Sequence, residues 1–170
     1  MSQISANLAS IRDRFKPILM ASQKIAEHLE ITNLSSDLDE TEIREFAKHF
    51  KVYKLSAGDI LFDEGDPESY MGVLIKGKLA VLKADTDGNQ QKISEIGPGK
   101  TVGEMSLIDG HPRSASIRVE EEAFVMILYV GRFNEILLNE PRLGVKLLMY
   151  IMRLMSASLR MTSNTVAALS

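Results

Sequence analysis

The stretch with the most specific chemistry runs from Val102 to Ile117 and reads VGEMSLIDGHPRSASI. Gly103 permits a close approach of the backbone, and residues 104–108 suffice for one helical turn whose free N–H groups would point at an anion. Arg113 offers a planar fork that suits phosphate oxygens, and Ser114 adds a hydroxyl donor beside it. These residue types at this spacing predict a site for a small anion.

Glu104 indicates which other group the anionic ligand carries. A carboxylate beside a phosphate site is repulsive unless it accepts hydrogen bonds from another part of the ligand, and a ribose hydroxyl is the obvious donor. An anion clamp next to a hydroxyl acceptor therefore indicates a nucleotide. The alternative is a surface ion pair between Glu104 and Arg113, which would be worth little. The glycine-led turn and the Pro-Arg-Ser-Ala run favour the ligand.

The run GEMSLIDGHPRSA resembles the phosphate-binding cassette of cyclic nucleotide-binding domains. Such domains occur in catabolite-activator-type regulators, protein kinase A regulatory subunits and gated channels. The resemblance covers about residues 34–169, and a cassette in this order is a more specific signal than one short motif. Upstream residues that resemble the first half of that family's barrel are Gly58, Leu61-Phe62, Glu64-Gly65-Asp66, Tyr70 and Ile75-Lys76-Gly77.

The resemblance implies a role for each cassette residue. The ligand-binding residues that it implies here are Gly103, Glu104, Met105, Ser106, Arg113, Ser114 and Ala115. The arginine would hold the cyclic phosphate, assisted by the hydroxyl of the serine after it and by the N–H groups around Met105 and Ser106. The glutamate would accept the ribose 2′-hydroxyl. The arginine lies nine positions after the glutamate, as in the kinase-regulatory version of the cassette.

The segment Leu159-Arg160-Met161-Thr162-Ser163 is instead similar to catabolite activators, in which a threonine and a serine contact the adenine amino edge. The serine reaches across the dimer in those proteins. Thr162 and Ser163 are therefore further candidate ligand residues, and cAMP is the expected ligand. Both hydroxyls can donate and accept, so cGMP and cyclic dinucleotides stay open. The alternative is a weakly packed helix end.

Composition excludes several classes of function. The chain has 170 residues, 45% hydrophobic residues, a net charge of −3 and no cysteine. Such a surface has no general basic field, so we expect no nucleic-acid binding by this chain alone. The sequence shows no signal peptide and no apolar run of about 20 residues, so we expect a cytoplasmic protein without a membrane segment. His28, His49 and His111 are too scattered for a metal site, and no catalytic constellation or cofactor motif stands out. The sequence does not indicate an enzyme.

The elements that must position the cassette are mainly short strands. From Lys51 onward, apolar or alternating runs are separated by glycine- and proline-containing turn signals. Two of these runs, residues 71–75 and 79–83, are predicted to be separate strands joined at Lys76-Gly77-Lys78, and residues 114–119 and 124–129 are two more. The predicted fold class is mainly β with flanking α: a double-stranded antiparallel β-helix, or jelly-roll barrel, with N-terminal helices and a long C-terminal helix.

Helical patterns occupy both ends. Residues 1–30, which include Ile4, Leu8 and Ile11, carry an apolar stripe that Pro17 interrupts, so we expect two helices or a kink, packed on this domain or a partner subunit. A short helix should begin near Asp37 or Asp39, and another should cover residues 131–139. From Pro141 the apolar pattern repeats every 3.5 residues along a helix longer than one barrel can cover, and the remaining seam predicts a parallel coiled-coil dimer. Its members are Leu143, Leu147, Tyr150 or Ile151, Leu154, Ser158, Met161, Thr165 and Ala168.

These patterns divide the chain into three parts. Residues 1–33 form an N-terminal helical arm, residues 34–130 a β-barrel core with a short leading helix, and residues 131–170 a hinge helix and a long dimerisation helix. We expect a cyclic nucleotide sensor that signals through its C-terminal helix to an unidentified protein partner. The alternative is a protein-interaction module whose pocket is unused. In transcriptional relatives a DNA-reading domain would begin after Ser170, so the chain either acts on another protein or belongs to a longer one.

Overall fold

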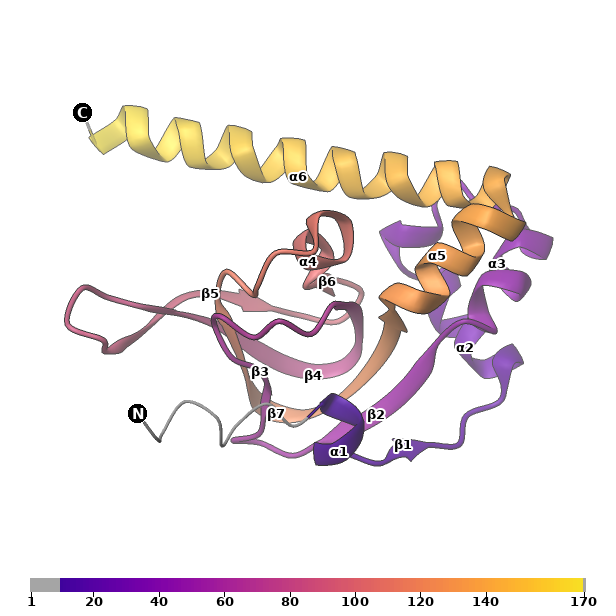
Figure 1. Cartoon of the computed structure of the whole chain (residues 1–170), viewed down its shortest axis with the longest axis horizontal. Helices are drawn as coiled ribbons and strands as arrows, with labels where there is room; N and C mark the ends of the chain where they lie inside the picture. Colours follow the sequence, from indigo (N-terminus) through magenta and orange to yellow (C-terminus); the bar gives the residue numbers. More distant parts are fainter. Residues whose placement is uncertain (1–9, 170) are drawn as a thin grey trace.

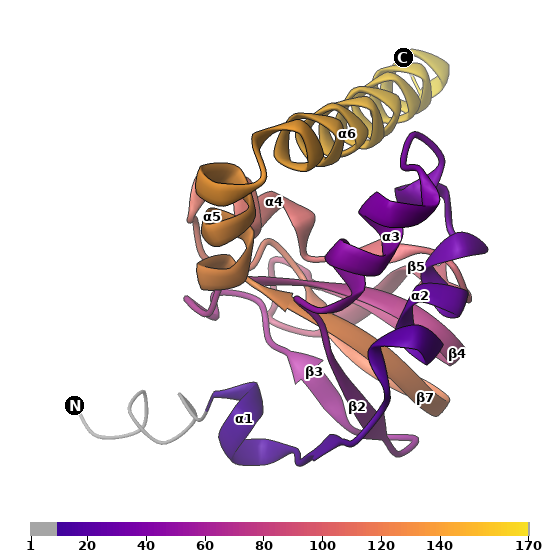
Figure 2. The ribbon, with the colours of Figure 1, turned by 90° about the vertical axis from the view of Figure 1, so that its right-hand side faces the viewer.

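The computed structural model describes residues 10–169 of the chain. Its centre is an antiparallel β roll with the sheet order β1-β2-β7-β4-β5, in which β3 also pairs with β7 and β6 with β4. Helices cover one end and the top of this roll (Figures 1 and 2). The strands are β1 Pro17–Ile18, β2 Lys51–Leu55, β3 Ile60–Phe62, β4 Tyr70–Ala84, β5 Gln90–Ile96, β6 Thr101–Val102 and β7 Ser116–Tyr129. The predicted fold class is confirmed.

The long strands β4 and β7 pair along most of their length, with register shifts between Leu74 and Leu79. The sequence predicted two strands in each segment and a turn at Lys76-Gly77-Lys78. That prediction is wrong, because the chain bends there without leaving the sheet. Gly77 has φ of +99°, and a Cβ at this position would lie 2.4 Å from the carbonyl oxygen of Glu122. The glycine thus lets one strand pair bend and serve both halves of the roll.

The helices begin and end largely where caps and prolines indicate. They are α1 Ile11–Arg14, α2 Ser22–Glu30, the 3-10 turn η1 Asn33–Ser35, α3 Glu40–Ala47, α4 Glu104–Asp109, α5 Val130–Asn139 and α6 Pro141–Leu169. At α3, the Glu42 backbone N–H donates to the Asp39 carboxylate and the Asp39 N–H donates to the Glu42 carboxylate, both at 2.9 Å. This capping box makes Asp39 the N-cap, one of the two predicted starting positions.

From residue 10 onward, the N-terminal arm contains two helices, one of the two expected outcomes. α1 is a single turn, and Pro17 then begins the edge strand β1, which pairs with β2 at Tyr53. Ile11 is fully buried beneath the roll. The stripe residues Ile4 and Leu8 lie outside the described residues. The arm therefore packs on its own domain through α1, β1 and α2.

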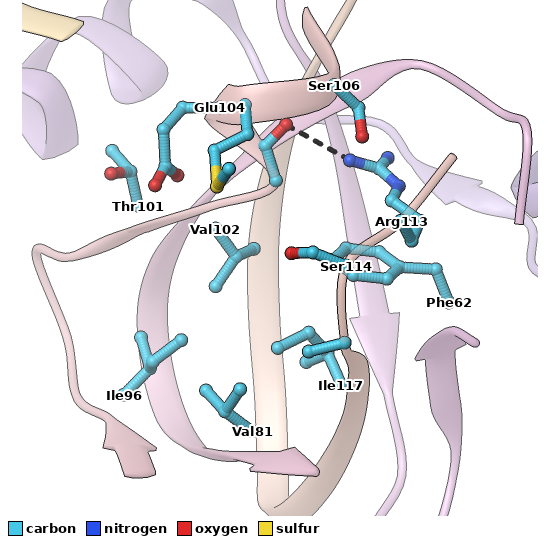
Figure 3. Close-up of a pocket in the computed structure, with 13 residues that line it drawn as sticks. Phe62, Val81, Ile96, Thr101, Val102, Glu104, Ser106, Arg113, Ser114 and Ile117 are labelled. Carbon is cyan, nitrogen blue, oxygen red and sulfur yellow. Dashed lines mark hydrogen bonds between the residues drawn. The ribbon is translucent and has the colours of Figure 1, made fainter. Parts of the chain in front are cut away.

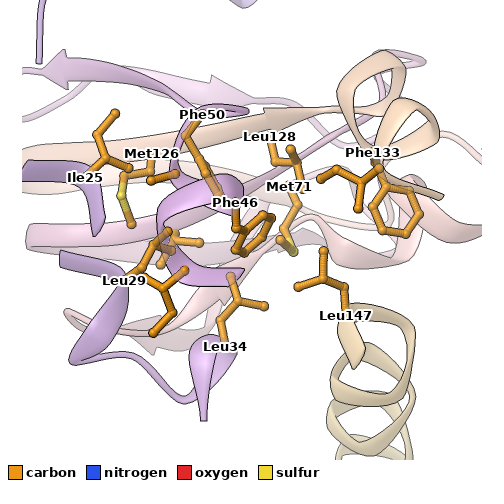
Figure 4. Close-up of a cluster of buried hydrophobic side chains, with 14 of the residues drawn as sticks. Ile25, Leu29, Leu34, Phe46, Phe50, Met71, Met126, Leu128, Phe133 and Leu147 are labelled. Carbon is orange, nitrogen blue, oxygen red and sulfur yellow. The ribbon is translucent and has the colours of Figure 1, made fainter. Parts of the chain in front are cut away.

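Two buried clusters hold the molecule together. One fills the roll and includes Tyr53, Leu61, Tyr70 and Val125. The other lies between the sheet and the helices and includes Ile25, Leu29, Phe46, Met71, Met126, Phe133 and Leu147 (Figure 4). Since successive residues of a strand face opposite sides, β4 places Tyr70 in the first cluster and Met71 in the second. The roll is thereby fixed to α2, α3, α5 and the start of α6.

α6 has 29 residues, about 44 Å at 1.5 Å per residue, and crosses above α4 (Figure 1). Leu143, Leu147 and Ile151 of the predicted apolar pattern are buried in this chain's own helical cluster. The domain therefore covers the first part of this pattern, and only the rest of the helix is left for the predicted dimer contact. A different stripe of α6 is open: Met152 is 62% exposed and Leu159 is 68% exposed.

No helix within residues 10–169 has the combination of length and apolar composition that would let it cross a membrane.

Candidate functional site

A cavity of about 160 Å³ opens between α4 and the roll. Seven of the predicted ligand residues line it, namely Gly103, Glu104, Met105, Ser106, Arg113, Ser114 and Ala115. Phe62, Val81, Ile96, Thr101, Val102 and Ile117 complete the lining (Figure 3). The two sides of the cassette come together because β6 pairs with β4, and β4 pairs with the strand β7 that follows Arg113. Polar groups occupy the α4 side, whereas Val81, Ile96 and Ile117 form an apolar floor (Figure 3).

Gly103 lets the cassette turn approach Arg113 closely. It caps the N-terminus of α4 with φ of 75°, in the left-handed region. A Cβ there would lie 2.4 Å from Nη1 of Arg113 and 2.9 Å from the carbonyl oxygen of Tyr70. Its own carbonyl oxygen accepts a hydrogen bond from Nη1 of Arg113 at 3.0 Å. Only glycine lets the turn and the arginine come this close.

Arg113 is a cation held almost without solvent, since 3% of it is exposed. Its guanidinium lies 4.0 Å from the ring centroid of Phe62 and 4.3 Å from that of Tyr70, two cation–π contacts. Burial lowers the pKa of the guanidinium, an effect that Tyr70 and nearby carboxylates oppose. Among the described residues, its Nε and Nη2 have no hydrogen-bond partner. A buried cation with unused donors is a ready site for an anion.

Glu104 sits at the other end of the same cavity. Burial raises the pKa of its carboxyl, partly offset by a backbone hydrogen bond and by the charge of Arg113. Its Oε2 is buried and finds no partner within residues 10–169. Arg113 bonds Gly103 instead of this carboxylate, so the mutual ion pair considered as an alternative does not form. The carboxylate is left as an acceptor without a donor.

Three further residues at this site were not singled out from the sequence. Phe62 and Tyr70 were assigned to the barrel pattern, yet their rings stack on Arg113. Thr101 has a buried hydroxyl oxygen without a partner in the described part of the chain, beside Glu104 (Figure 3). No local motif indicates the roles of Phe62 and Tyr70, because both depend on a contact with Arg113 across the roll.

Thr101 and Glu104 also line a second cleft, about 470 Å³ in volume, which lies beneath α6. Its other wall includes Tyr150, Leu154 and Ser158 of α6. Burial raises the pKa of the Tyr150 phenol. The cavity and the cleft beneath α6 therefore share two polar residues, Thr101 and Glu104.

Thr162 and Ser163 lie on the exposed part of α6 and do not line the cavity of the single chain. The Thr162 hydroxyl donates to the carbonyl oxygen of Ser158 at 3.0 Å. Their contact with a ligand stays a prediction that involves movement of α6 or a second copy of the chain. No group of three or more potential metal ligands gathers among residues 10–169.

Comparisons with known proteins agree with this geometry. The family model described as "Cyclic nucleotide-binding domain" matches residues 52–140. The "CRP-like cAMP-activated global transcriptional regulator" of Mycobacterium tuberculosis is 24% identical over 132 residues, 78% of this chain and 57% of that protein. The "cAMP-activated global transcriptional regulator CRP" of Salmonella typhimurium is 26% identical over 126 residues, 74% of this chain and 58% of that protein. The chain therefore spans somewhat more than half the length of these curated relatives.

Among solved structures, a cyclic nucleotide-binding domain from Methylobacillus flagellatus superposes with a TM-score of 0.77 at 29% identity. The superposition covers 88% of this chain and 84% of that chain.

Proposed function

This chain belongs to the cyclic nucleotide-binding domain family, and we propose that it is a regulatory sensor whose ligand is a cyclic nucleotide, preferentially cAMP. The observation that carries the proposal is Arg113, a buried cation whose Nε and Nη2 face no acceptor among the described residues. A cyclic phosphate supplies two oxygens to such a fork. The Ser114 hydroxyl and the N–H groups at Met105 and Ser106 add donors around the same anion.

Glu104 supports a ribose rather than a bare phosphate. Its unpartnered Oε2 accepts the 2′-hydroxyl of the ligand, which relieves the cost of a buried acceptor without a donor. A free phosphate carries no ribose hydroxyl, and its negative charge would face the carboxylate. The pair of Arg113 and Glu104 thus selects a ligand with an anion at one end and hydroxyls at the other.

The size of the cavity bears on where the base lies. Drug-sized ligands usually occupy about 300–1,000 Å³, and the cavity of about 160 Å³ is smaller. The cyclic phosphate and ribose fill it, and the base extends over the apolar floor toward α6. Thr162 and Ser163 then serve as the base contacts, with the serine offered from a second copy. The preference for cAMP rests on this similarity and on the names of the curated relatives.

The output runs through α6. Ligand binding at Glu104 changes one wall of the cleft that Tyr150 and Ser158 share, and a coupling of about 1–3 kcal/mol is the usual size of such linkage. The stripe of exposed Met152, partly buried Met155, and exposed Leu159 and Thr162, spaced by three and four residues, is the dimer seam. The dimer acts in the cytoplasm on a partner protein and has no catalytic role of its own.

The test is calorimetric titration of nucleotide-free protein with cAMP, cGMP and cyclic di-GMP, repeated on Arg113→Ala. We expect saturable binding of cAMP that the variant loses. Tighter binding of another nucleotide would refute the preference for cAMP. Absence of binding by all three would refute the sensor and favour the alternative of an interaction module with an unused pocket.

A further inference from the structure

Although α1 is a single turn, both a buried side chain and several hydrogen bonds attach it to the roll. The Ile11 side chain is fully buried in the cluster that fills the roll. The carboxylate of Glu68 accepts the Ser10 hydroxyl at 2.7 Å and the Ile11 backbone N–H at 3.0 Å. Both oxygens of one carboxylate thus hold the first turn of α1 in place.

Arg14 connects α1 to β3. Its Nη1 donates to the carbonyl oxygen of Ile60 at 2.9 Å, and its Nη2 donates to that of Leu61 at 2.7 Å. The Leu61 oxygen also accepts the Tyr70 hydroxyl at 2.9 Å. A single backbone oxygen therefore ties the arm, the strand β3 and the ring of Tyr70 together.

The next link is the arginine of the cavity. β3 ends at Phe62, and the rings of Phe62 and Tyr70 are the two that stack on Arg113. The two rings also meet each other edge to face, with centroids 5.9 Å apart. A continuous set of direct contacts consequently runs from α1, through the Leu61 carbonyl and the aromatic pair, to the guanidinium.

We infer that α1 is a positioning element for Arg113, acting through Arg14 and the aromatic pair. The inference rests on the proposed function in so far as Arg113 binds the phosphate. Because the guanidinium of Arg113 makes one hydrogen bond, its orientation depends on the faces of the two rings. A displacement of about 0.5 Å would weaken its binding of a phosphate. Because coupling is reciprocal, a bound ligand also holds α1 more firmly against the roll.

The first experiment needs no ligand. The Nε proton of Arg113 lies by the faces of two aromatic rings, so its NMR resonance carries an upfield ring-current shift, and its assignment follows from its loss in Arg113→Lys. We expect Arg14→Gln to move this resonance downfield. Lys16→Gln removes the same charge from an exposed side chain of the same arm and should leave the resonance in place. Arg14→Lys, which keeps the charge but not the fork, should give a smaller shift and serves if Arg14→Gln does not fold.

The second experiment measures affinity. We expect Arg14→Gln to weaken cAMP binding about fivefold or more, within the range of ordinary couplings, while Lys16→Gln stays within about twofold of wild type. An Arg113 resonance that is unmoved in a folded Arg14 variant overturns the inference. So does a moved resonance with unchanged affinity. If wild type binds no cyclic nucleotide, the proposed function fails, and the resonance still decides whether α1 positions Arg113.

Discussion

Replacing Arg113 by methionine should separate stability from binding. The structure places this cation where it is 3% exposed, with one hydrogen bond and two ring contacts. Methionine keeps much of the volume and the contact with the rings but has no charge and no N–H. We expect Arg113→Met to leave the free energy of unfolding of the nucleotide-free protein nearly unchanged and to weaken ligand binding at least about 30-fold.

The magnitudes follow from the contacts. A hydrogen bond from a charged donor contributes about 1.5–3 kcal/mol, and each desolvated cation–π contact contributes about 1–2 kcal/mol. Taking the cation out of water costs several kcal/mol, so the two sides cancel to within a few kcal/mol. Loss of the charge pair with a phosphate costs about 2–5 kcal/mol, which corresponds to about 30-fold to several thousand-fold in Kd.

The assay is urea unfolding followed by circular dichroism, with and without cAMP. Ligand at about 100 times the wild-type Kd should stabilise wild type by about 2.7 kcal/mol and Arg113→Met by less than about 1 kcal/mol. Arg118→Met, at an exposed arginine of β7, is the matched control and should respond to cAMP as wild type does. A loss of more than about 3 kcal/mol in the nucleotide-free Arg113 variant would refute the reasoning, because the arginine would then be a structural residue.

Three other changes have distinct outcomes. Glu104→Gln should stabilise the nucleotide-free protein at neutral pH. Burial raises the folded-state pKa of this carboxyl, so at a pH above that pKa the ionised carboxylate lowers the free energy of unfolding of wild type. The gain should shrink as the pH falls through the raised pKa, and a pH-independent difference in urea titrations would contradict this. Gly77→Ala should lower the free energy of unfolding by well over about 1 kcal/mol, since its Cβ would meet a β7 carbonyl oxygen. Gly88→Ala, also at positive φ but in open space, should cost less, and equal losses would show that the clash is unimportant. Leu159→Glu should shift sedimentation toward monomer at a concentration where Ala157→Glu, on the opposite side of α6, does not. Equal effects would exclude the proposed seam.

The strands show where local patterns mislead. Lys76-Gly77-Lys78 has the residues of a turn, and only the approach of Glu122 from β7 makes it a bend within β4. The local sequence contains Gly77, but it does not show that the backbone of Glu122 packs against this glycine. The segments of β4 and β7 were therefore each divided into two strands, even though the fold class was predicted.

The long helix gives the complementary case. Its heptad-like stripe is real, and Leu143, Leu147 and Ile151 pack in this chain's own helical cluster. Periodicity identifies an apolar face but not the surface that covers it. The structure shows which apolar residues of α6 the domain covers, and it leaves Met152 and Leu159 exposed.

The sequence by itself determined the jelly-roll class, the capped start of α3 and the cassette from Gly103 to Ala115, because these depend on residue types at short spacing. Tertiary structure alone decided that Phe62 and Tyr70 enclose Arg113, that α1 supports them through Arg14, and which face of α6 is open. The physical reason is that stacking, burial and shared carbonyl acceptors join residues distant in the chain, and their energies depend on positions that only the packed roll defines.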